Sequence, residues 1–455
     1  MRFSKAQVMS RVHTIPELRF EDQDLTSCAG LVIFQTLFHQ LDLSPRLRKC
    51  FAHIGKSGSY GLGKIFLLLV VHILLGYRRL RELDYYRDDP MVLRVLGLRR
   101  IPDVATVSRN LQRVDMRSCD EVAGVLRESV IHRIVADCSA RVTLDFDGSV
   151  CSTRRQAEGT AVGFNRKHKG DRSYYPLFCT VAQTGQVLDV LHRSGNVHDS
   201  HDAHGFLRRC FEGVGARMPG AVMESRMDSA FFSWETVDLL DRRGVEFTLS
   251  VPFERLPDLK GRIERRERWH RINDVWSYFE LDWAPKSWPG TLRTLVVRQA
   301  VPTRDKGPIQ LDLFRPREWG YDYTVIATNK AVAAKHIIAF HHGRGSQEGI
   351  FSELKSHCQM DYIPTRRWAA NRLYVLAAVM AHNLTRELQM QTMSPELRNT
   401  AKRTALWAFE KLSTIRNTLI RRAGRLTRPA GRLVLTLSTN QAVQSGIERY
   451  LSKAA

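Results

Sequence analysis

The sequence has no CxxC pair of cysteines, no apolar segment long enough to span a membrane, and too few acidic residues to balance its basic ones. Its eight cysteines are scattered over 455 residues, a pattern that indicates reduced thiols and excludes a disulfide framework or a zinc ribbon. The longest apolar run, Ile65–Tyr77, is interrupted by His72 and Gly76 and is shorter than the roughly 20 residues that cross a bilayer. It therefore predicts a buried helix. Because no signal peptide is visible either, we expect a cytoplasmic protein without membrane contact.

The chain is rich in basic charge. It contains 69 Lys and Arg against 47 Asp and Glu, a formal net charge of +22. Hydrophobic residues make up 43% of the chain, which is ordinary globular composition and excludes a largely disordered protein. A folded protein with this excess of positive charge is typical of one that meets a polyanion, most commonly nucleic acid. The alternatives are a generally basic proteome or a protein of the membrane surface.

The length of the chain predicts several regions, since it exceeds what one compact core accommodates. Helical periodicity dominates its beginning, and two-residue alternation starts at Arg141. Strands in a meander, followed by strands alternating with helices, indicate a mixed sheet covered by helices. We expect a helical N-terminal region at 1–135, an α/β domain at 136–253 and 322–392, a Trp-rich β insertion at 254–321 and a basic C-terminal tail at 393–455. The tail carries ten Lys or Arg between Arg398 and Arg432, against Glu410 alone.

Within the expected sheet domain, Tyr174–Ala182 is predicted as one strand, which a turn at Thr184-Gly185 joins to a second strand at Gln186–Leu191. The apolar segment Leu373–Leu384 is predicted as a buried helix.

The N-terminal region contains a candidate helix-turn-helix. Asp89-Pro90 predicts a helix start and Gly97 a helix end, and Pro102-Asp103 opens a further helix. Short helices joined by tight turns can form a DNA-binding unit, although many such hairpins are merely structural. The polar side chains able to face a DNA groove are Ser108, Arg109, Gln112 and Arg113.

Three carboxylates lie at the ends or on the faces of predicted elements. Alternation over Val142–Asp147 predicts a strand that places Asp145 and Asp147 on one face. Asp228 follows another predicted strand, and Glu348 lies on a predicted helix. Converging carboxylates suit Mg²⁺, and two such ions can clamp the attacking and leaving oxygens of an in-line phosphoryl displacement. Taken singly, each of these acids is more commonly a solvated surface group.

The surroundings of Glu348 add two cations. His341, Arg344, Glu348 and Lys355 fall close to one stripe if a single helix spans them, although the glycines on either side of Arg344 weaken that continuity. An acid beside a guanidinium and an ammonium suits a negatively charged phosphate backbone. The alternative is an ordinary ion pair between Arg344 and Glu348 within one helix.

This spacing resembles the Y-x2-R-x3-E-x6-K signature of DDE transposases in the insertion-sequence-four superfamily, with His341 at the Tyr position. Two further segments, Leu144–Ser149 and Arg226–Ser233, resemble the first-Asp and second-Asp motifs of that superfamily. The resemblance runs from about Arg141 to Leu384, and shorter segments are similar to the thirteen-eighty group of these elements, namely Gly163–Lys167, Ser173–Pro176 and Ser194–Asn196.

The resemblance implies an α/β fold with an RNase H-like mixed sheet flanked by helices, a β-rich insertion and a helical N-terminal DNA-binding region. It implies that Asp147, Asp228 and Glu348 are the catalytic, metal-binding acids and that they use Mg²⁺, with Mn²⁺ as a substitute. Asp145 is the reserve candidate for the first acid, because it shares the strand face of Asp147. The implied contacts to DNA phosphate come from Arg344 and Lys355, with His341 at the Tyr position of the signature. Separately, the basic loop Gly163–Gly170 offers Arg166 and Lys167 to the DNA backbone, the alternative being a solvated loop.

The activity implied is that of a DNA transposase. Metal-activated water cuts the DNA at the ends of an insertion sequence, and the 3′-hydroxyl is joined to target DNA by a cut-and-paste route. The implied partners are double-stranded DNA at terminal inverted repeats, target DNA and a second copy of the chain in a synaptic homodimer, located at the nucleoid. Relatives often form a DNA hairpin, and a Trp of the insertion can hold a flipped base; residues 269, 276, 283 and 288 are equal candidates, although Trp in a small β module is more often core.

Two other functions fit the same residues. A stand-alone metal-dependent nuclease would cut DNA without joining it, and a regulator derived from a transposase would bind DNA with a silent catalytic centre; the three intact acids count against the latter. A separate cluster, His198, His201 and His204, has the spacing of a zinc site but is more simply a polar loop or a helix start.

Overall fold

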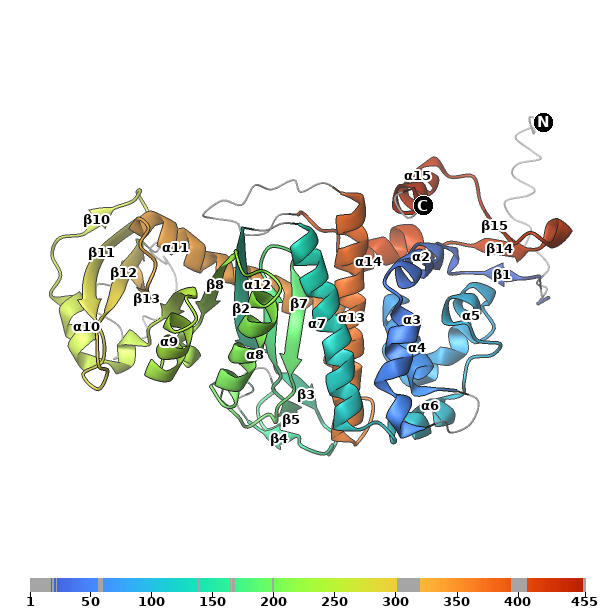
Figure 1. Cartoon of the computed structure of the whole chain (residues 1–455), viewed down its shortest axis with the longest axis horizontal. Coiled ribbons are helices and arrows are strands. Elements are labelled where there is room, and N and C mark those ends of the chain that lie inside the picture. The colour runs from blue at the N-terminus through green and yellow to red at the C-terminus, as the bar shows by residue number, and fades with distance from the viewer. Residues whose placement is uncertain are drawn as a thin grey trace, which may run out of the picture.

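The computed structural model describes residues 18, 20–21, 23–55, 60–137, 140–163, 165, 168–198, 200–300, 320–393 and 407–452. The N-terminal helices, the central sheet and the β-rich region follow one another along the long axis, and the C-terminal segments return to the N-terminal helices (Figure 1). Across the described ranges, no helix combines the length and the hydropathy needed to cross a bilayer. The cysteines in those ranges are buried and unpaired, as expected for reduced thiols.

The N-terminal region is helical, as predicted. Asp89 caps a helix by accepting hydrogen bonds from the backbone N–H groups of Met91 and Val92, and Gly97 ends that helix with a left-handed backbone, φ +60°. Asp103 caps the next helix. The helices of this region are α2 (Val32–Gln40), α3 (Leu43–Cys50), α4 (Leu62–Leu74), α5 (Pro90–Leu96), α6 (Val104–Leu111) and α7 (Met116–Ala136).

The described residues form one large mixed sheet of nine strands. Its spatial order is β10 (His270–Arg271), β11 (Trp276–Trp283), β12 (Leu292–Ala300), β13 (Tyr321–Thr328), β9 (Glu246–Ser250), β8 (Val222–Met227), β2 (Arg141–Gly148), β6 (Leu177–Val181) and β7 (Gln186–Leu191). Strands β2, β6 and β7 form an antiparallel meander, β8 pairs parallel to β2, and β9 pairs parallel to β8. This is the arrangement of an RNase H-like sheet, so the predicted fold class is confirmed.

The predicted strand Tyr174–Ala182 is divided in the structure. Pro176 interrupts it, because proline has no N–H to donate to a sheet ladder. Its first part is β5 (Arg172–Tyr174), which pairs with β3 (Cys151–Thr153) and β4 (Ala161–Val162) in a separate small sheet. Its second part is β6, and the predicted hairpin from β6 into β7 is present, with Gly185 at φ +61° in the turn.

The strands of the 254–321 region extend the main sheet. Strand β12 pairs with β13, and β13 pairs with β9 of the central sheet. The described part of the region is therefore β-rich, as predicted, and it continues the central sheet by edge-to-edge pairing. Helix α8 (Ala203–Gly215) connects β7 to β8 beside the central strands, whereas α9 (Trp234–Asp241) and α10 (Pro257–Glu264) lie on the side of the β-rich region (Figure 1).

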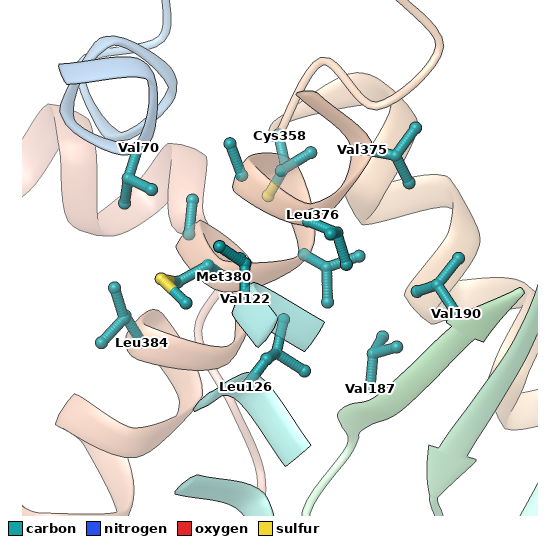
Figure 2. Close-up of a cluster of buried hydrophobic side chains, with 14 of the residues drawn as sticks. Val70, Val122, Leu126, Val187, Val190, Cys358, Val375, Leu376, Met380 and Leu384 are labelled. Carbon is teal, nitrogen blue, oxygen red and sulfur yellow. The ribbon is translucent and has the colours of Figure 1, made fainter. Parts of the chain in front are cut away.

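The core is organised around α13 (Trp368–Thr392), which contains the predicted buried helix Leu373–Leu384. It packs against α4, α7 and β7, and so joins the N-terminal helices to the central sheet. Figure 2 shows this junction, where apolar side chains from the four elements meet: Val70 from α4, Val122 and Leu126 from α7, Val187 and Val190 from β7, and Leu376, Met380 and Leu384 from α13.

The described part of the predicted basic tail is folded onto the N-terminal region. Its elements are α14 (Leu412–Ile415), a π-helical turn (Arg416–Ile420), β14 (Gly424–Thr427), β15 (Val434–Leu437) and α15 (Gln441–Leu451). Strand β14 pairs with β1 (Leu25–Thr26). Arg416 is buried and donates hydrogen bonds to the carbonyl oxygens of Ile73, Leu74 and His357, so this tail arginine holds the fold together and does not reach phosphate.

We expect Leu376→Ala to lower the free energy of unfolding by about 2–5 kcal/mol, because it leaves a cavity where α13 meets its neighbours. Leu376 is only 1% exposed. Urea denaturation followed by circular dichroism measures the loss. Val135→Ala on the more exposed face of α7 is the control and should change stability by less than about 0.5 kcal/mol. Equal losses in the two variants would contradict the central role of this junction.

Candidate active site

Two of the predicted acids lie at the ends of neighbouring parallel strands. Asp147 is near the end of β2, and Asp228 directly follows β8 with an extended backbone. The parallel register pairs Asp145 with Arg226, and Asp147 and Asp228 each come two residues later. Since side chains alternate along a strand and adjacent strands are about 4.8 Å apart, the two acids share one face and one level of the sheet. The fold thus brings together carboxylates that are remote in sequence.

Each of these carboxylates also accepts a local backbone hydrogen bond. Asp147 Oδ1 accepts from the N–H of Gly148 at 2.8 Å, and Asp228 Oδ1 accepts from the N–H of Ala230 at 3.0 Å. The second bond caps a short 3-10 turn, Ser229–Phe231. These contacts fix the direction of the acids at the ends of their strands.

Asp145 has a structural role and is corrected as the reserve candidate for the first acid. Its side chain and that of Arg226 are each 1% exposed and form an ion pair, with Arg226 Nε 2.8 Å from Asp145 Oδ1. Arg226 also donates to the carbonyl oxygen of Phe340 at 3.2 Å. Burial raises the pKa of Asp145, and the guanidinium of Arg226 partly offsets that rise. Because it is enclosed in this pair, Asp145 does not face a substrate.

The third predicted acid, Glu348, lies on a helix that packs beside the end of β2. Helix α11 (Ala334–His342) and helix α12 (Ser346–Ser356) are separated by a 3-10 turn at Gly343–Gly345, so no single helix carries the whole signature. Gln347 donates from Nε2 to the carbonyl oxygen of Asp145 at 3.1 Å. The ring of Phe351 packs 5.2 Å from that of Phe178, the register partner of Asp147. Glu348 is exposed at this end of α12.

Arg344 pairs with the first acid. Its Nη1 atom lies 3.6 Å from Asp147 Oδ2, so its guanidinium offsets part of the carboxylate charge. Among the ion pairs of the described residues Arg344 contacts Asp147 and not Glu348, which excludes the simple intrahelical pair considered from the sequence.

Lys355 lies near the residues that follow the first acid. It is half-buried on α12 and is close enough to Cys151, the first residue of β3, to oppose the rise in the pKa of that thiol, which burial brings to about 12. The ammonium is therefore on the same side of the fold as the end of β2.

The prediction that His341 contacts DNA phosphate is wrong. The residue is buried, and its Nδ1 and Nε2 atoms each lie 2.9 Å from a hydroxyl on β9, those of Thr248 and Ser250. Burial, with a smaller contribution from Arg344, lowers the pKa of His341 to about 3. A neutral ring with both nitrogens engaged fastens α11 to the sheet and offers no charge to a phosphate.

The remaining predicted DNA contacts have different outcomes. Arg166 and Lys167 lie outside the described residues. Arg109 and Gln112 are exposed at the end of α6, and Ser108 is half-buried there. Arg113 is corrected, because its guanidinium donates to the carbonyl oxygens of residues 54 and 55 at 3.2 Å and so braces the preceding loop.

The sequence did not distinguish the tryptophans of the insertion, but packing does. Trp288 stacks on Phe232 with ring centroids 4.7 Å apart and lies 5.8 Å from Trp234, so it packs against the segment that follows Asp228. The other three pack elsewhere: residue 269 on Phe279, residue 276 on His342 and residue 283 in the core. No sequence signal identifies Trp288, because its partners are remote along the chain.

Throughout the described parts of the chain, no three His, Cys, Asp or Glu side chains are gathered closely enough to hold a metal ion. His198, His201 and His204, whose spacing in the sequence is that of a zinc site, are therefore not gathered into such a group. Asp147 and Asp228 nevertheless supply the hard oxygen donors that Mg²⁺ prefers. With Glu348 exposed on the adjacent helix, the chemistry of the donor set fits this ion.

The chain was compared with curated proteins, solved structures and protein families. A comparison with curated proteins found no match. Among solved structures, the piggyBac transposase synaptic complex with hairpin DNA matches with a TM-score of 0.42 and 11% identity over 78% of this chain and 74% of that chain. The Mos1 transposase paired-end complex with left transposon end matches with a TM-score of 0.18 and 12% identity over 42% of this chain and 60% of that chain.

The family model described as transposase DDE domain group 1 matches residues 12–454. Because this match covers nearly the whole chain, the protein belongs to the DDE transposases, a family of phosphoryl-transfer enzymes.

Proposed function

We propose that this protein cuts DNA at the ends of an insertion sequence of the insertion-sequence-four superfamily, thirteen-eighty group, and joins the 3′-hydroxyl to target DNA. The observation that carries the proposal is the parallel register of β2 and β8, which sets Asp147 and Asp228 at one level of the sheet. The anchoring of α12 on β2 through Gln347 supports Glu348 as the third acid. The proposed assembly is a homodimer that holds two terminal inverted repeats and the target duplex.

The residues of the site have distinct roles in this proposal. Asp147, Asp228 and Glu348 would hold Mg²⁺, or Mn²⁺ in its place, and the ion when bound activates the attacking oxygen and polarises the phosphate. Arg344 orients Asp147 and offers its remaining donors to a phosphate oxygen in bidentate geometry. Lys355 adds a point charge along the same side. The net charge of +22 draws the polyanionic substrate to the protein.

We expect Asp228→Asn to reduce cleavage of DNA carrying the element end by more than about 100-fold. Loss of a residue that only supports a metal ligand lowers activity by about 10–100-fold, and loss of the ligand itself should lower it at least as much. Binding of the same DNA should be retained. Gel assays of cleavage and binding with Mg²⁺ measure both effects. Asp282→Asn, which removes an exposed acid from β11, is the matched control and should cleave normally. Cleavage by the Asp228 variant at the wild-type rate would exclude this residue from the centre.

Lys355→Ala should weaken DNA binding and make it less sensitive to salt. Loss of one phosphate contact lowers the slope of log affinity against log salt concentration by about 1. Fluorescence anisotropy titrations between low and moderate salt measure the slope. Lys355→Arg retains the charge and should keep the wild-type slope. An unchanged slope in the Ala variant would mean that Lys355 does not touch the phosphate backbone.

A joining assay separates transposase from nuclease. Precut ends with free 3′-hydroxyls, incubated with wild-type protein, Mg²⁺ and a supercoiled plasmid, should yield covalent joints that Asp228→Asn cannot form. Cleavage of uncut ends without any joining would support a stand-alone nuclease. Binding with neither reaction would support a silent regulator.

A further inference from the structure

We propose that the two-stranded ribbon of β14 and β15 inserts into the major groove of duplex DNA, with Arg428 and Arg432 at its tip. The inference rests on the proposed function, since it names an element by which this protein grips its DNA. The proposal gives a specific contact with DNA to a segment whose sequence shows only that it is basic.

The ribbon has a free outer end. Its strands pair from Gly424 opposite Leu437 to Thr427 opposite Val434. Strand β1 pairs with residues 424 and 425, and the preceding Asp24 accepts a hydrogen bond from the N–H of Leu426. Beyond that point the ribbon is two strands wide, and it extends away from the N-terminal helices (Figure 1). The major groove of DNA, about 12 Å wide, admits a ribbon of this width.

The turn at the tip has a defined backbone. Pro429 begins it, and Ala430 and Gly431 both have left-handed backbones, with φ of +50° and +79°. The N–H of Gly431 donates to the carbonyl oxygen of Arg428 at 3.3 Å, and that of Arg432 to Pro429 at 3.0 Å. The two arginines therefore flank a fixed turn, which reduces the conformational entropy lost when they bind a ligand.

The ribbon has one apolar face and one polar face. Leu426 is buried and is paired with Leu435, so this face lies against the protein. The alternate pairs carry Arg425 opposite Thr436 and Thr427 opposite Val434. The face that carries them therefore presents two hydroxyl groups, which are donors and acceptors suited to phosphates and base edges. The guanidinium of Arg425 on this face donates to the carbonyl oxygen of Gln23 at 3.1 Å.

The tip arginines have no partner within the described part of the protein. Both are exposed, and neither guanidinium makes a hydrogen bond or an ion pair with another described residue. The other arginines of this segment donate to backbone carbonyl oxygens, namely residues 416, 421, 422 and 425. From Lys411 to Ile447 the chain has seven basic residues and no acidic one, so this segment supplies no carboxylate to pair with the tip arginines.

The chemistry favours duplex DNA as the partner. A guanidinium fork matches the O6 and N7 acceptors of guanine in the major groove, whereas the major groove of A-form RNA is too deep and narrow for side chains to read. In Figure 1 the N-terminal helices separate the ribbon from β2 and β8. A ribbon in this position holds DNA away from the point of cleavage, so it contributes to recognition and not to chemistry.

The test uses the full-length protein and DNA carrying the terminal repeat with its flanks. We expect Arg428→Ala/Arg432→Ala to weaken binding of this DNA by about tenfold or more. Arg428→Lys/Arg432→Lys should recover salt-dependent binding without the sequence preference. Arg265→Ala/Arg268→Ala removes the same charge from the exposed surface of the insertion and is the control.

Methylation interference identifies the groove. Guanine N7 methylation should block wild-type binding at a set of positions that the Ala double variant no longer senses. Interference confined to adenine N3 would overturn the major-groove assignment, and wild-type affinity and interference in a folded Ala variant would overturn the ribbon proposal alone. Failure of wild-type protein to bind the repeat would overturn both this inference and the proposed function.

Discussion

The site depends on the buried ion pair between Asp145 and Arg226. It locks the register of the two parallel strands that end in Asp147 and Asp228, and through Phe340 it ties α11 to the same face. Removing one partner of such a pair leaves an unpaired buried charge, which costs about 3–5 kcal/mol. The charged pair in the interior therefore helps to keep the two neighbouring acids at one level, while the acids themselves lie at the ends of their strands.

Much of the secondary structure could be predicted from hydrophobic periodicity and from the residues that start and end helices. Alternation over Val142–Asp147 gave β2, and Asp89-Pro90 and Gly97 bounded α5, because local sterics and hydrogen bonds decide these features. The sheet order was accessible through the family resemblance. Periodicity does not show which of two acids on the same strand face has which role. Asp145 and Asp147 both lie on that face, and only the ion pair of Asp145 with the distant Arg226 identifies Asp145 as the structural acid.

Other errors have the same origin in long-range packing. The sequence suggests that His341 is a cation beside a phosphate, but the residue is buried against hydroxyl groups on β9, and burial lowers its pKa so that the ring stays neutral. Arg113 reads as a groove contact, but it satisfies carbonyl oxygens at the end of a nearby loop. In the basic segment, burial separates Arg416, which supports α4, from Arg428 and Arg432, which remain exposed. The charge pattern of the sequence alone does not reveal which arginines form hydrogen bonds within the fold and which remain exposed.

The pairing of β1 with β14 has a consequence for synthesis. Residues near 25 find their sheet partner near 425, and Arg416 caps carbonyl groups at the end of α4. During synthesis, an N-terminal region that has already emerged therefore lacks partners for its edge strand and helix end until residues 416–425 have also emerged. Folding from the N-terminus outward, the usual order during translation, leaves this region incomplete, so its final packing waits for a segment about 400 residues further along the chain.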